Sequence, residues 1–247
     1  MAKEIIKIDN LKRYFKVGDE TVKALRGISF TIYEGEFVTI MGTSGSGKST
    51  LLNTLGCLDT PTSGDYFLDG INVRGMGKNE RAKIRNRKIG FIFQNYNLLP
   101  KTTALENVEL PLLYNSTISA KDRTQMAKSC LIEVGLEDRL YHKSNQMSGG
   151  QQQRVAIARA LVNNPVILLA DEATGNLDTR TSFSILTLFQ KLYKEGKTII
   201  FVTHNPDIAM YSSRNIMLRD GRIVSDEYNS DIKSAEEIYN NLPVDTD

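Results

Sequence analysis

The chain has 247 residues, of which 40% are hydrophobic and 24% are charged. This length and composition predict a large folded domain and exclude a disordered chain. Because 31 Lys and Arg residues nearly balance 29 Asp and Glu residues, the formal charge of +2 argues against a protein that coats nucleic acid.

The first part of the chain alternates between polar and apolar residues. Residues 6–11 and 27–33 show this alternation, and glycine or charged turns follow both segments. Such a pattern is typical of antiparallel strands that are buried on one face. We therefore expect an antiparallel β layer beside the main sheet.

Four segments have the pattern of strands that open onto turns or helices: residues 37–41, 89–93, 166–170 and 198–203. Three of them are continuous apolar runs rich in Ile, Val and Phe, as in parallel strands covered on both faces. Helical stretches separate these strands. The predicted fold class is therefore α/β with a mostly parallel sheet.

Helical periodicity replaces the strand pattern between residues 98 and 164, most clearly at 122–134 and 151–162. This predicts an inserted helical subdomain in a single domain that spans residues 1–247. The predicted parts are a core with its β layer at 1–97 and 165–225, the helical subdomain at 98–164, and an acidic tail at 226–247. We expect the tail to be a solvating or loosely docked end.

The segment 78–88 is strongly basic, and two readings stay open for it: a solvated helix face, or contact with acidic lipid or a partner. Cys57 and Cys130 stand in no CxxC spacing, which favours ordinary core thiols in a reducing compartment. The apolar runs are far shorter than the roughly 18 residues of a membrane-spanning helix. The first residues also lack a secretory signal. We expect a cytoplasmic protein.

A glycine-rich loop with the pattern GxxxxGKS follows the strand at 37–41. It consists of Gly42, Thr43, Ser44, Gly45, Ser46, Gly47, Lys48 and Ser49, and Thr50 comes next. Glycines let backbone N–H groups turn toward a phosphate, and the N-terminus of the next helix adds positive potential. Lys48 offers a compact charge and Ser49 a hydroxyl for Mg²⁺. The loop predicts a nucleotide site.

Two adjacent carboxylates follow the buried strand at 166–170. This edge of an open α/β sheet is where ligands bind. Because successive residues point in different directions, Asp171 can hold the water shell of Mg²⁺ while Glu172 faces an attacking water. Combined with the glycine-rich loop, the pair predicts nucleotide hydrolysis.

The segment MSGGQ at residues 147–151 resembles the LSGGQ signature of ABC-type ATPases, with Met in place of Leu. Ser148 is a good N-cap, and Gly149 and Gly150 expose N–H groups where a helix begins. This is a second phosphate receptor. The resemblance implies a P-loop fold with a RecA-like core and a head-to-tail homodimer. Each ATP would lie between the Lys48 loop of one subunit and Ser148 to Gln151 of the other.

The resemblance assigns roles to three further polar residues. Gln94 would touch Mg²⁺ and the attacking water. His204 would contact the γ-phosphate and orient the catalytic Glu172, and Asp178 would communicate between the two sites. From the residues alone, Gln94 reads as a turn residue, His204 as a satisfied histidine at a strand end, and Asp178 as a helix cap.

An aromatic side chain would stack on adenine, by the same resemblance. Its spacing to Gly18 favours Phe15, while the adjacent Tyr14 stays open, and either could belong to the core. Ala173 stands where the family usually has Pro, which we expect to affect loop rigidity only. His142 matches no functional position and is expected on the surface.

The resemblance covers about residues 5–224. A narrower similarity, at 56–59, 93–100, 103–111 and 149–160, is to the ATPase subunits of macrolide-export and lipoprotein-release transporters. It implies an ATP-hydrolysing subunit that powers a separate membrane permease for export, lipoprotein release or mechanotransmission. The permease would contact the region from Gln94 to Pro100, at the inner face of the plasma membrane.

Two alternatives share these nucleotide residues. One is a soluble or regulatory ABC-type ATPase that serves cell division or cofactor assembly as a scaffold. The other is a nucleic-acid-directed ATPase that would use the basic segment 78–88. The near-neutral charge disfavours the second alternative, so we expect no nucleic-acid partner.

Overall fold

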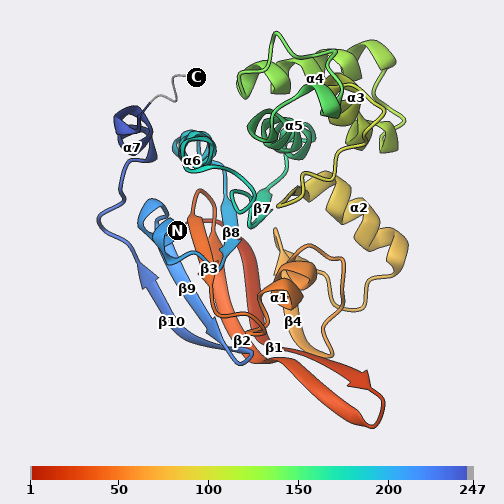
Figure 1. Cartoon of the computed structure of the whole chain (residues 1–247). Helices are drawn as coiled ribbons and strands as arrows, with labels where there is room; N and C mark the ends of the chain where they lie inside the picture. Colours follow the sequence, from red (N-terminus) through yellow and green to blue (C-terminus); the bar gives the residue numbers. More distant parts are fainter. Residues whose placement is uncertain (1, 244–247) are drawn as a thin grey trace.

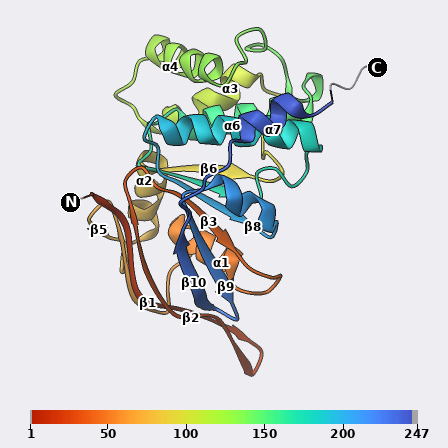
Figure 2. The same ribbon diagram turned by 90° about the vertical axis from the view of Figure 1, so that its left-hand side faces the viewer.

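The computed structural model describes residues 2–243, in which the β-strands form two sheets (Figures 1 and 2). The first is an antiparallel sheet in the order β2-β1-β4-β5, and it confirms the expected β layer. Its strands are β1 (Glu4–Val17), β2 (Glu20–Tyr33), β4 (Ser63–Leu68) and β5 (Ile71–Asn72). The strands β1 and β2 form a long hairpin that extends beyond both predicted segments.

The second sheet has six strands in the order β10-β9-β3-β8-β7-β6. The predicted strands correspond to β3 (Phe37–Met41), β6 (Ile89–Phe93), β7 (Ile167–Asp171) and β8 (Ile199–Thr203), which pair in parallel. Every residue of β3 and β8 is buried, as their continuous apolar runs indicated. Two strands were not anticipated, β9 (Arg214–Arg219) and β10 (Arg222–Tyr228), because polar residues interrupt their apolar pattern.

Helices cover both faces of this sheet. The helices α3 (Ala104–Glu109), α4 (Ala120–Glu133), α5 (Gly149–Leu161) and α6 (Thr179–Lys194) lie on one side, and α1 (Lys48–Leu55) lies between the sheet and the β layer. Along β8, Ile199 and Phe201 pack toward the first group, while Ile200 packs toward α1. The alternating directions of a strand's side chains thus divide the core into two layers.

Side-chain caps set where the helices of the larger group begin. In each of them, the oxygen of a Thr, Ser or Asp accepts a hydrogen bond from the backbone N–H three residues later, as expected of N-caps. The capping residues are Thr103, Ser119, Ser148 and Asp178. Short 3-10 helices, η1 (Leu110–Tyr114), η2 (Ser144–Gln146) and η3 (Pro206–Tyr211), complete the connections.

The C-terminal segment departs from the expectation of a solvating or loosely docked tail from Asp226 onward. Residues 226–228 belong to β10, and α7 (Ala235–Asn241) lies beside α6 (Figure 1). Ala235 is fully buried, and its N–H donates to the side-chain oxygen of Gln190. At the far end, Arg180 donates to the carbonyls of Leu242 and Pro243. A charge count does not register these contacts; residues 244–247 lie outside the described residues.

Three smaller expectations concern the basic segment, the two cysteines and His142. The basic helix α2 (Lys78–Lys88) has no buried residue, as a solvated face requires. Cys57 is buried and Cys130 half-buried, and burial raises the pKa of each thiol to about 11. His142 is partly exposed, as a surface position allows, and its carbonyl accepts a hydrogen bond from the N–H of Ala104.

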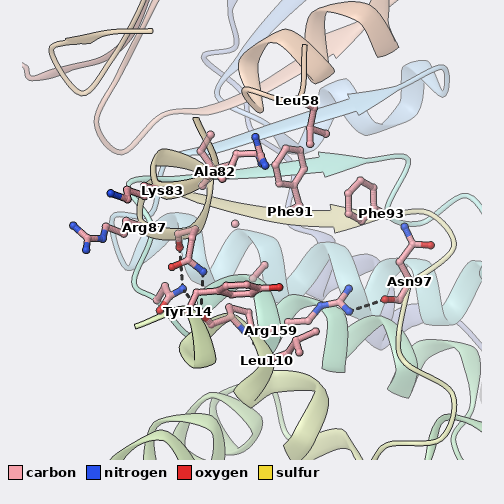
Figure 3. Close-up of a pocket in the computed structure, with 17 residues that line it drawn as sticks. Leu58, Ala82, Lys83, Arg87, Phe91, Phe93, Asn97, Leu110, Tyr114 and Arg159 are labelled. Atoms are coloured by element: carbon pink, nitrogen blue, oxygen red, sulfur yellow. Dashed lines mark hydrogen bonds between the residues drawn. The ribbon is translucent and has the colours of Figure 1, made fainter. Parts of the chain in front are cut away.

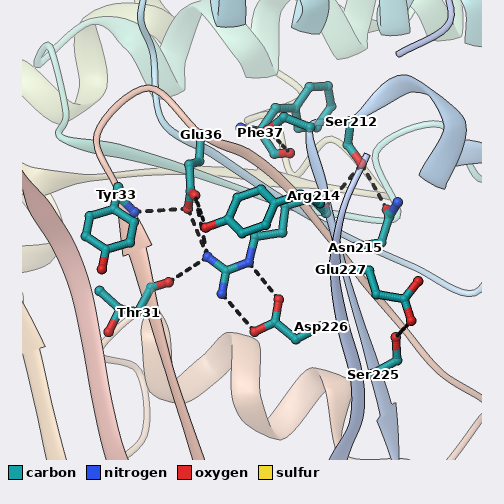
Figure 4. A network of polar contacts seen from close by, with 12 residues as sticks. Thr31, Tyr33, Glu36, Phe37, Ser212, Arg214, Asn215, Ser225, Asp226 and Glu227 are labelled. Atoms are coloured by element: carbon teal, nitrogen blue, oxygen red, sulfur yellow. Dashed lines mark hydrogen bonds and ion pairs between the residues drawn. The ribbon is translucent and has the colours of Figure 1, made fainter. Parts of the chain in front are cut away.

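A buried arginine joins the two sheets at the end where β3 begins (Figure 4). Arg214 of β9 donates from Nε and Nη2 to both carboxylate oxygens of Asp226, at 2.7 and 2.8 Å. Its Nη1 donates to the carbonyl of Thr31 in β2 at 2.7 Å and to Glu36 at 3.2 Å. The hydroxyl of Tyr228 also donates to Glu36. Asp226, and with it Glu36, raises the pKa of Arg214 above its ordinary value.

Replacing this arginine should destabilise the whole fold. We expect Arg214→Ala to lower the free energy of unfolding by about 3 kcal/mol, because two mostly buried carboxylates lose their counter-charge. Urea unfolding measures this loss. Arg219→Ala, at an exposed position of the same strand, should change it by less than about 0.5 kcal/mol. Equal losses in the two variants would contradict a stabilising role for the network.

Candidate nucleotide site

The glycine-rich loop connects β3 to α1 and needs glycine for structural reasons. Gly47 has a left-handed φ of 104°, which favours glycine over other residues. A Cβ on Gly42 would lie 2.2 Å from the carbonyl oxygen of Leu218 in β9. The loop can therefore lie directly against the sheet edge, with the N-terminus of α1 pointing into the space above it.

A cavity of about 820 Å³ opens beside this loop. Its volume suits a nucleotide. Its lining residues come from β2, the loop with α1, and three sheet-edge loops: Thr21, Val22, Lys23, Ala24, Arg26, Ser44, Gly45, Gly47, Lys48, Ser49, Thr50, Glu172, His204, Asp220 and Gly221. The sequence analysis missed the contribution of β2, because these residues carry no motif and reach the cavity only through the way the β layer folds over the sheet.

The lysine of the loop rests on the loop's own backbone. Its Nζ donates to the carbonyl oxygens of Gly42, at 2.7 Å, and Thr43, at 2.9 Å. These are neutral partners, so the ammonium group keeps a net charge to offer to an anion in the cavity. Ser46 of the same loop is buried, and its hydroxyl has no hydrogen-bond partner among residues 2–243.

The predicted carboxylate and histidine meet at the edge of this cavity. Glu172 follows β7 and His204 follows the neighbouring strand β8. The distance from Glu172 Oε1 to His204 Nδ1 is 2.6 Å. Glu172 has a φ of 45°, a left-handed conformation that costs free energy for a residue with a Cβ. Its N–H is held by the carbonyl of Val202 at 2.8 Å, and its carboxylate is thereby aimed at the cavity.

Two oxygen donors for a divalent cation come from the start of α1 and from the end of β7. Ser49 supplies a hydroxyl, and Asp171 at the end of β7 supplies a carboxylate. Burial raises the pKa of Asp171, as does neighbouring Glu172, while the charge of Lys48 opposes them. Because hydroxyl and carboxylate oxygens are the ligands that Mg²⁺ prefers, the residues present fit this ion.

Gln94 lies at the same sheet edge but outside the cavity lining. It follows Phe93, which pairs with Asp171 across β6 and β7. Its Nε2 donates to the side-chain oxygen of Asn176 at 3.1 Å, and the side-chain nitrogen of Asn176 donates back to Asn95 at 2.8 Å. The side chain of Gln94 is therefore held by the segment before α6. Its predicted contact with Mg²⁺ stays a prediction.

The signature residues lie at the start of α5 and do not line the cavity. Ser148 and Gln151 form a reciprocal capping box, in which each side chain accepts the other's backbone N–H. A Cβ on Gly150 would lie 2.4 Å from the Thr181 methyl, and one on Gly149 would lie 2.8 Å from the Tyr96 hydroxyl. The glycines thus allow close packing, a need that sequence reasoning did not find.

The remaining two predictions concern Asp178 and the aromatic pair. Asp178 caps α6 through the N–H of Thr181, and hydrogen bonds from Thr181 lower its pKa. This is the structural reading of Asp178, and its role between two sites stays a prediction. Phe15 and Tyr14 do not line the cavity, but they pair across the hairpin with Val22 and Lys23, which do. The choice between them stays open.

Comparison with known proteins decides the family. The family model described as ABC transporter matches residues 25–175, more than half of the chain. The chain belongs to the ABC transporter family. As an ABC ATPase, it has the expected combination of an antiparallel β layer and a mostly parallel sheet, and both the recognition and the fold class are confirmed.

Individual ABC relatives cover most of the chain. An ABC transporter ATP-binding protein of Thermotoga maritima is 55% identical over 221 residues, which are 90% of this chain and 94% of that one. The ATP-binding cassette MJ0796 of Methanocaldococcus jannaschii has a solved dimeric structure, described as a post-hydrolysis state bound to ADP and Pi. It superposes with a TM-score of 0.82 at 48% identity, over 90% of this chain and 98% of that one.

A third ABC relative is a macrolide export ATP-binding/permease protein, MacB of Syntrophobacter fumaroxidans. It is 50% identical over 222 residues, which are 89% of this chain but 31% of that protein. This ABC chain is therefore an ATP-binding subunit similar to MacB-type systems. No helix within residues 2–243 is long and apolar enough to cross a bilayer.

Proposed function

We propose that two copies of this ABC protein bind ATP with Mg²⁺ at their shared interface and hydrolyse it to drive a separate membrane permease. The main support for the proposal is that the predicted site residues lie in two separate places on the chain. Lys48, Glu172 and His204 surround one cavity, whereas the signature residues lie at the start of α5, outside it. A complete site then needs Ser148, Gly149, Gly150 and Gln151 from the second copy, and the MJ0796 relative is a dimer.

Each residue of the cavity has a distinct part in hydrolysis. The N–H groups from Gly42 to Thr50 and the charge of Lys48 would bind and orient the phosphates. Glu172 would accept a proton from the water that attacks the γ-phosphorus, and His204 would hold the Glu172 carboxylate in place. Mg²⁺, held through Ser49, Asp171 and Gln94, would neutralise charge on the phosphate oxygens when bound.

Purified protein tests this proposal directly. With Mg²⁺ and ATP, we expect phosphate release, and with a non-hydrolysable analogue we expect a dimer in sedimentation velocity. Removal of Mg²⁺ by EDTA should abolish phosphate release. A protein that stays monomeric with Mg²⁺ and analogue, even when its permease is supplied, would overturn the shared site.

The permease has a candidate docking groove beside β6, the strand that precedes Gln94 (Figure 3). A mainly apolar cavity of about 690 Å³ lies between α2, β6, η1 and α5. Phe91, Phe93, Leu110 and Tyr114 supply apolar surface, and Asn97 comes from the predicted contact region 94–100. The charged residues of the lining are all basic, among them Lys83 and Arg87 of α2. The groove supports a peripheral location at the inner face of the membrane.

An exposed aromatic residue in the groove allows a test in cells. Tyr114 is 79% exposed, so Tyr114→Ala should not unfold the protein. We expect it to lower the fraction of the chain retained on washed membranes by about fivefold or more, the loss typical of an aromatic anchor. Tyr141→Ala is the matched control, because Tyr141 is 66% exposed outside the groove. Equal retention of the two variants would favour the soluble, regulatory alternative.

A further inference from the structure

The loop after Gln94 contains a backbone corner that needs an external support. Tyr96 and Asn97 are consecutive residues with left-handed φ values of 57° and 49°. Asn tolerates this region, but Tyr rarely adopts it, and the two together store conformational strain. The corner therefore requires contacts that hold it in place.

Arg159 of α5 supplies that support. Its Nη1 donates to the carbonyl oxygen of Asn97 and its Nη2 to that of Tyr96, both at 2.7 Å. The planar guanidinium presents two parallel donors, a geometry that a lysine does not have. Burial lowers the pKa of Arg159 from its ordinary value.

The supported corner and the residues just before it contact both the signature helix and the segment before α6. The hydroxyl of Tyr96 lies against Gly149 at the start of the signature helix. Asn176 lies in the segment before α6. Its side chain accepts a hydrogen bond from the side chain of Gln94 and donates one to the side chain of Asn95. Asn97 and Arg159 also line the groove between α2 and α5, where Figure 3 shows their hydrogen bond at the edge of the cavity.

We propose that Arg159 is a positioning residue for ATP hydrolysis. By holding the left-handed corner at Tyr96 and Asn97, it fixes the position of Gln94 relative to the nucleotide cavity. Because Arg159 belongs to α5 and lines the groove, the same contact connects the groove to the signature helix. An occupant of the groove would act on hydrolysis through this contact. The inference rests on the proposed function of the nucleotide site.

Arg154 provides a matched control on the same helix. It also donates two hydrogen bonds to neutral acceptors, the carbonyl of Val134 at 2.6 Å and the hydroxyl of Ser184 at 2.7 Å. Burial lowers its pKa in the same way. Among the described residues, Arg154 donates no hydrogen bond to Tyr96 or Asn97. Arg154→Lys therefore measures the effect on kcat of losing a doubly bonded guanidinium on this helix away from the corner.

The experiment compares kcat and KM for ATP in the purified, full-length protein. Arg159→Lys should lower kcat by about tenfold or more with KM changed by less than about threefold, because the loss is one of positioning. Arg154→Lys should keep kcat within about twofold of wild type at a temperature well below its Tm. In the Arg159→Lys background, Asn97→Gly should restore kcat by about threefold, since glycine adopts the left-handed conformation without support.

Three results would overturn the inference. They are an unchanged kcat in Arg159→Lys, an equal fall in both arginine variants, and a fall that Asn97→Gly does not relieve. If Lys48→Ala still loses nucleotide affinity and Glu172→Gln still stops hydrolysis, such a result removes the role of Arg159 alone and leaves the proposed function standing.

Discussion

Glu172→Gln should bind ATP normally and hydrolyse it on the order of 10²- to 10⁴-fold more slowly, the contribution typical of a positioned general base. The amide has nearly the same shape as the carboxylate and can still bond to His204, but it does not accept a proton from water. ATP then stays intact, so we expect a stable dimer in sedimentation velocity, with Mg²⁺ and ATP, that wild-type protein forms only transiently.

The matched control is Glu137→Gln, because Glu137 is exposed and lies outside the cavity. Its phosphate release should match that of wild type. A Glu172→Gln protein that hydrolyses ATP at the wild-type rate would refute the assignment of Glu172 as the base. A Glu172→Gln protein that hydrolyses ATP slowly but fails to dimerise would instead mean that Glu172 acts in hydrolysis without a site shared between two copies.

Lys48→Ala should weaken ATP binding by about tenfold to a hundredfold, as expected when a charged hydrogen bond to a phosphate is lost. Titration calorimetry with Mg²⁺ and a non-hydrolysable analogue measures this change. The fold should survive, because the hydrogen bonds of the Lys48 ammonium group go to two carbonyls of its own loop. We expect the free energy of unfolding to stay within about 0.5 kcal/mol of wild type.

Lys101→Ala controls for the loss of one positive charge, since Lys101 is exposed away from the cavity. Its affinity for the analogue should equal that of wild type. An unchanged affinity in Lys48→Ala would mean that the loop does not bind the phosphates. An equal loss in both variants would point to a diffuse electrostatic effect.

The parallel strands were predictable because both of their faces are covered. Burial on two sides requires continuous apolar residues, and β3 and β8 show such runs almost to the residue. The strands β9 and β10 were missed because Arg214 begins β9 and Asp226 interrupts β10. These charges are tolerated because Arg214 pairs with Asp226 across the hairpin and with Glu36, which a linear pattern does not reveal.

Only part of the nucleotide site was predictable from the sequence. The residue pattern pointed to the glycine-rich loop and Glu172, and the family resemblance pointed to His204; the structure brings all three to one cavity, while their roles in hydrolysis stay predictions. The wall formed by β2 was not predictable, since Thr21 to Ala24 contribute position and carry no special chemistry. The hydrogen bonds from Arg159 to the carbonyls of Tyr96 and Asn97 were also missed, because neither backbone conformation nor carbonyl contacts can be inferred from a pattern of residue types.

The attachment of the C-terminal helix has a practical consequence for labelling. Arg180 holds the carbonyls of Leu242 and Pro243, and it lies two residues after Asp178, the residue proposed to communicate between two copies. A purification handle or fluorophore fused after Asp247 would start only a few residues from this contact. Fusions at this end are therefore expected to obstruct subunit pairing, and reporter groups for assembly assays belong elsewhere on the surface.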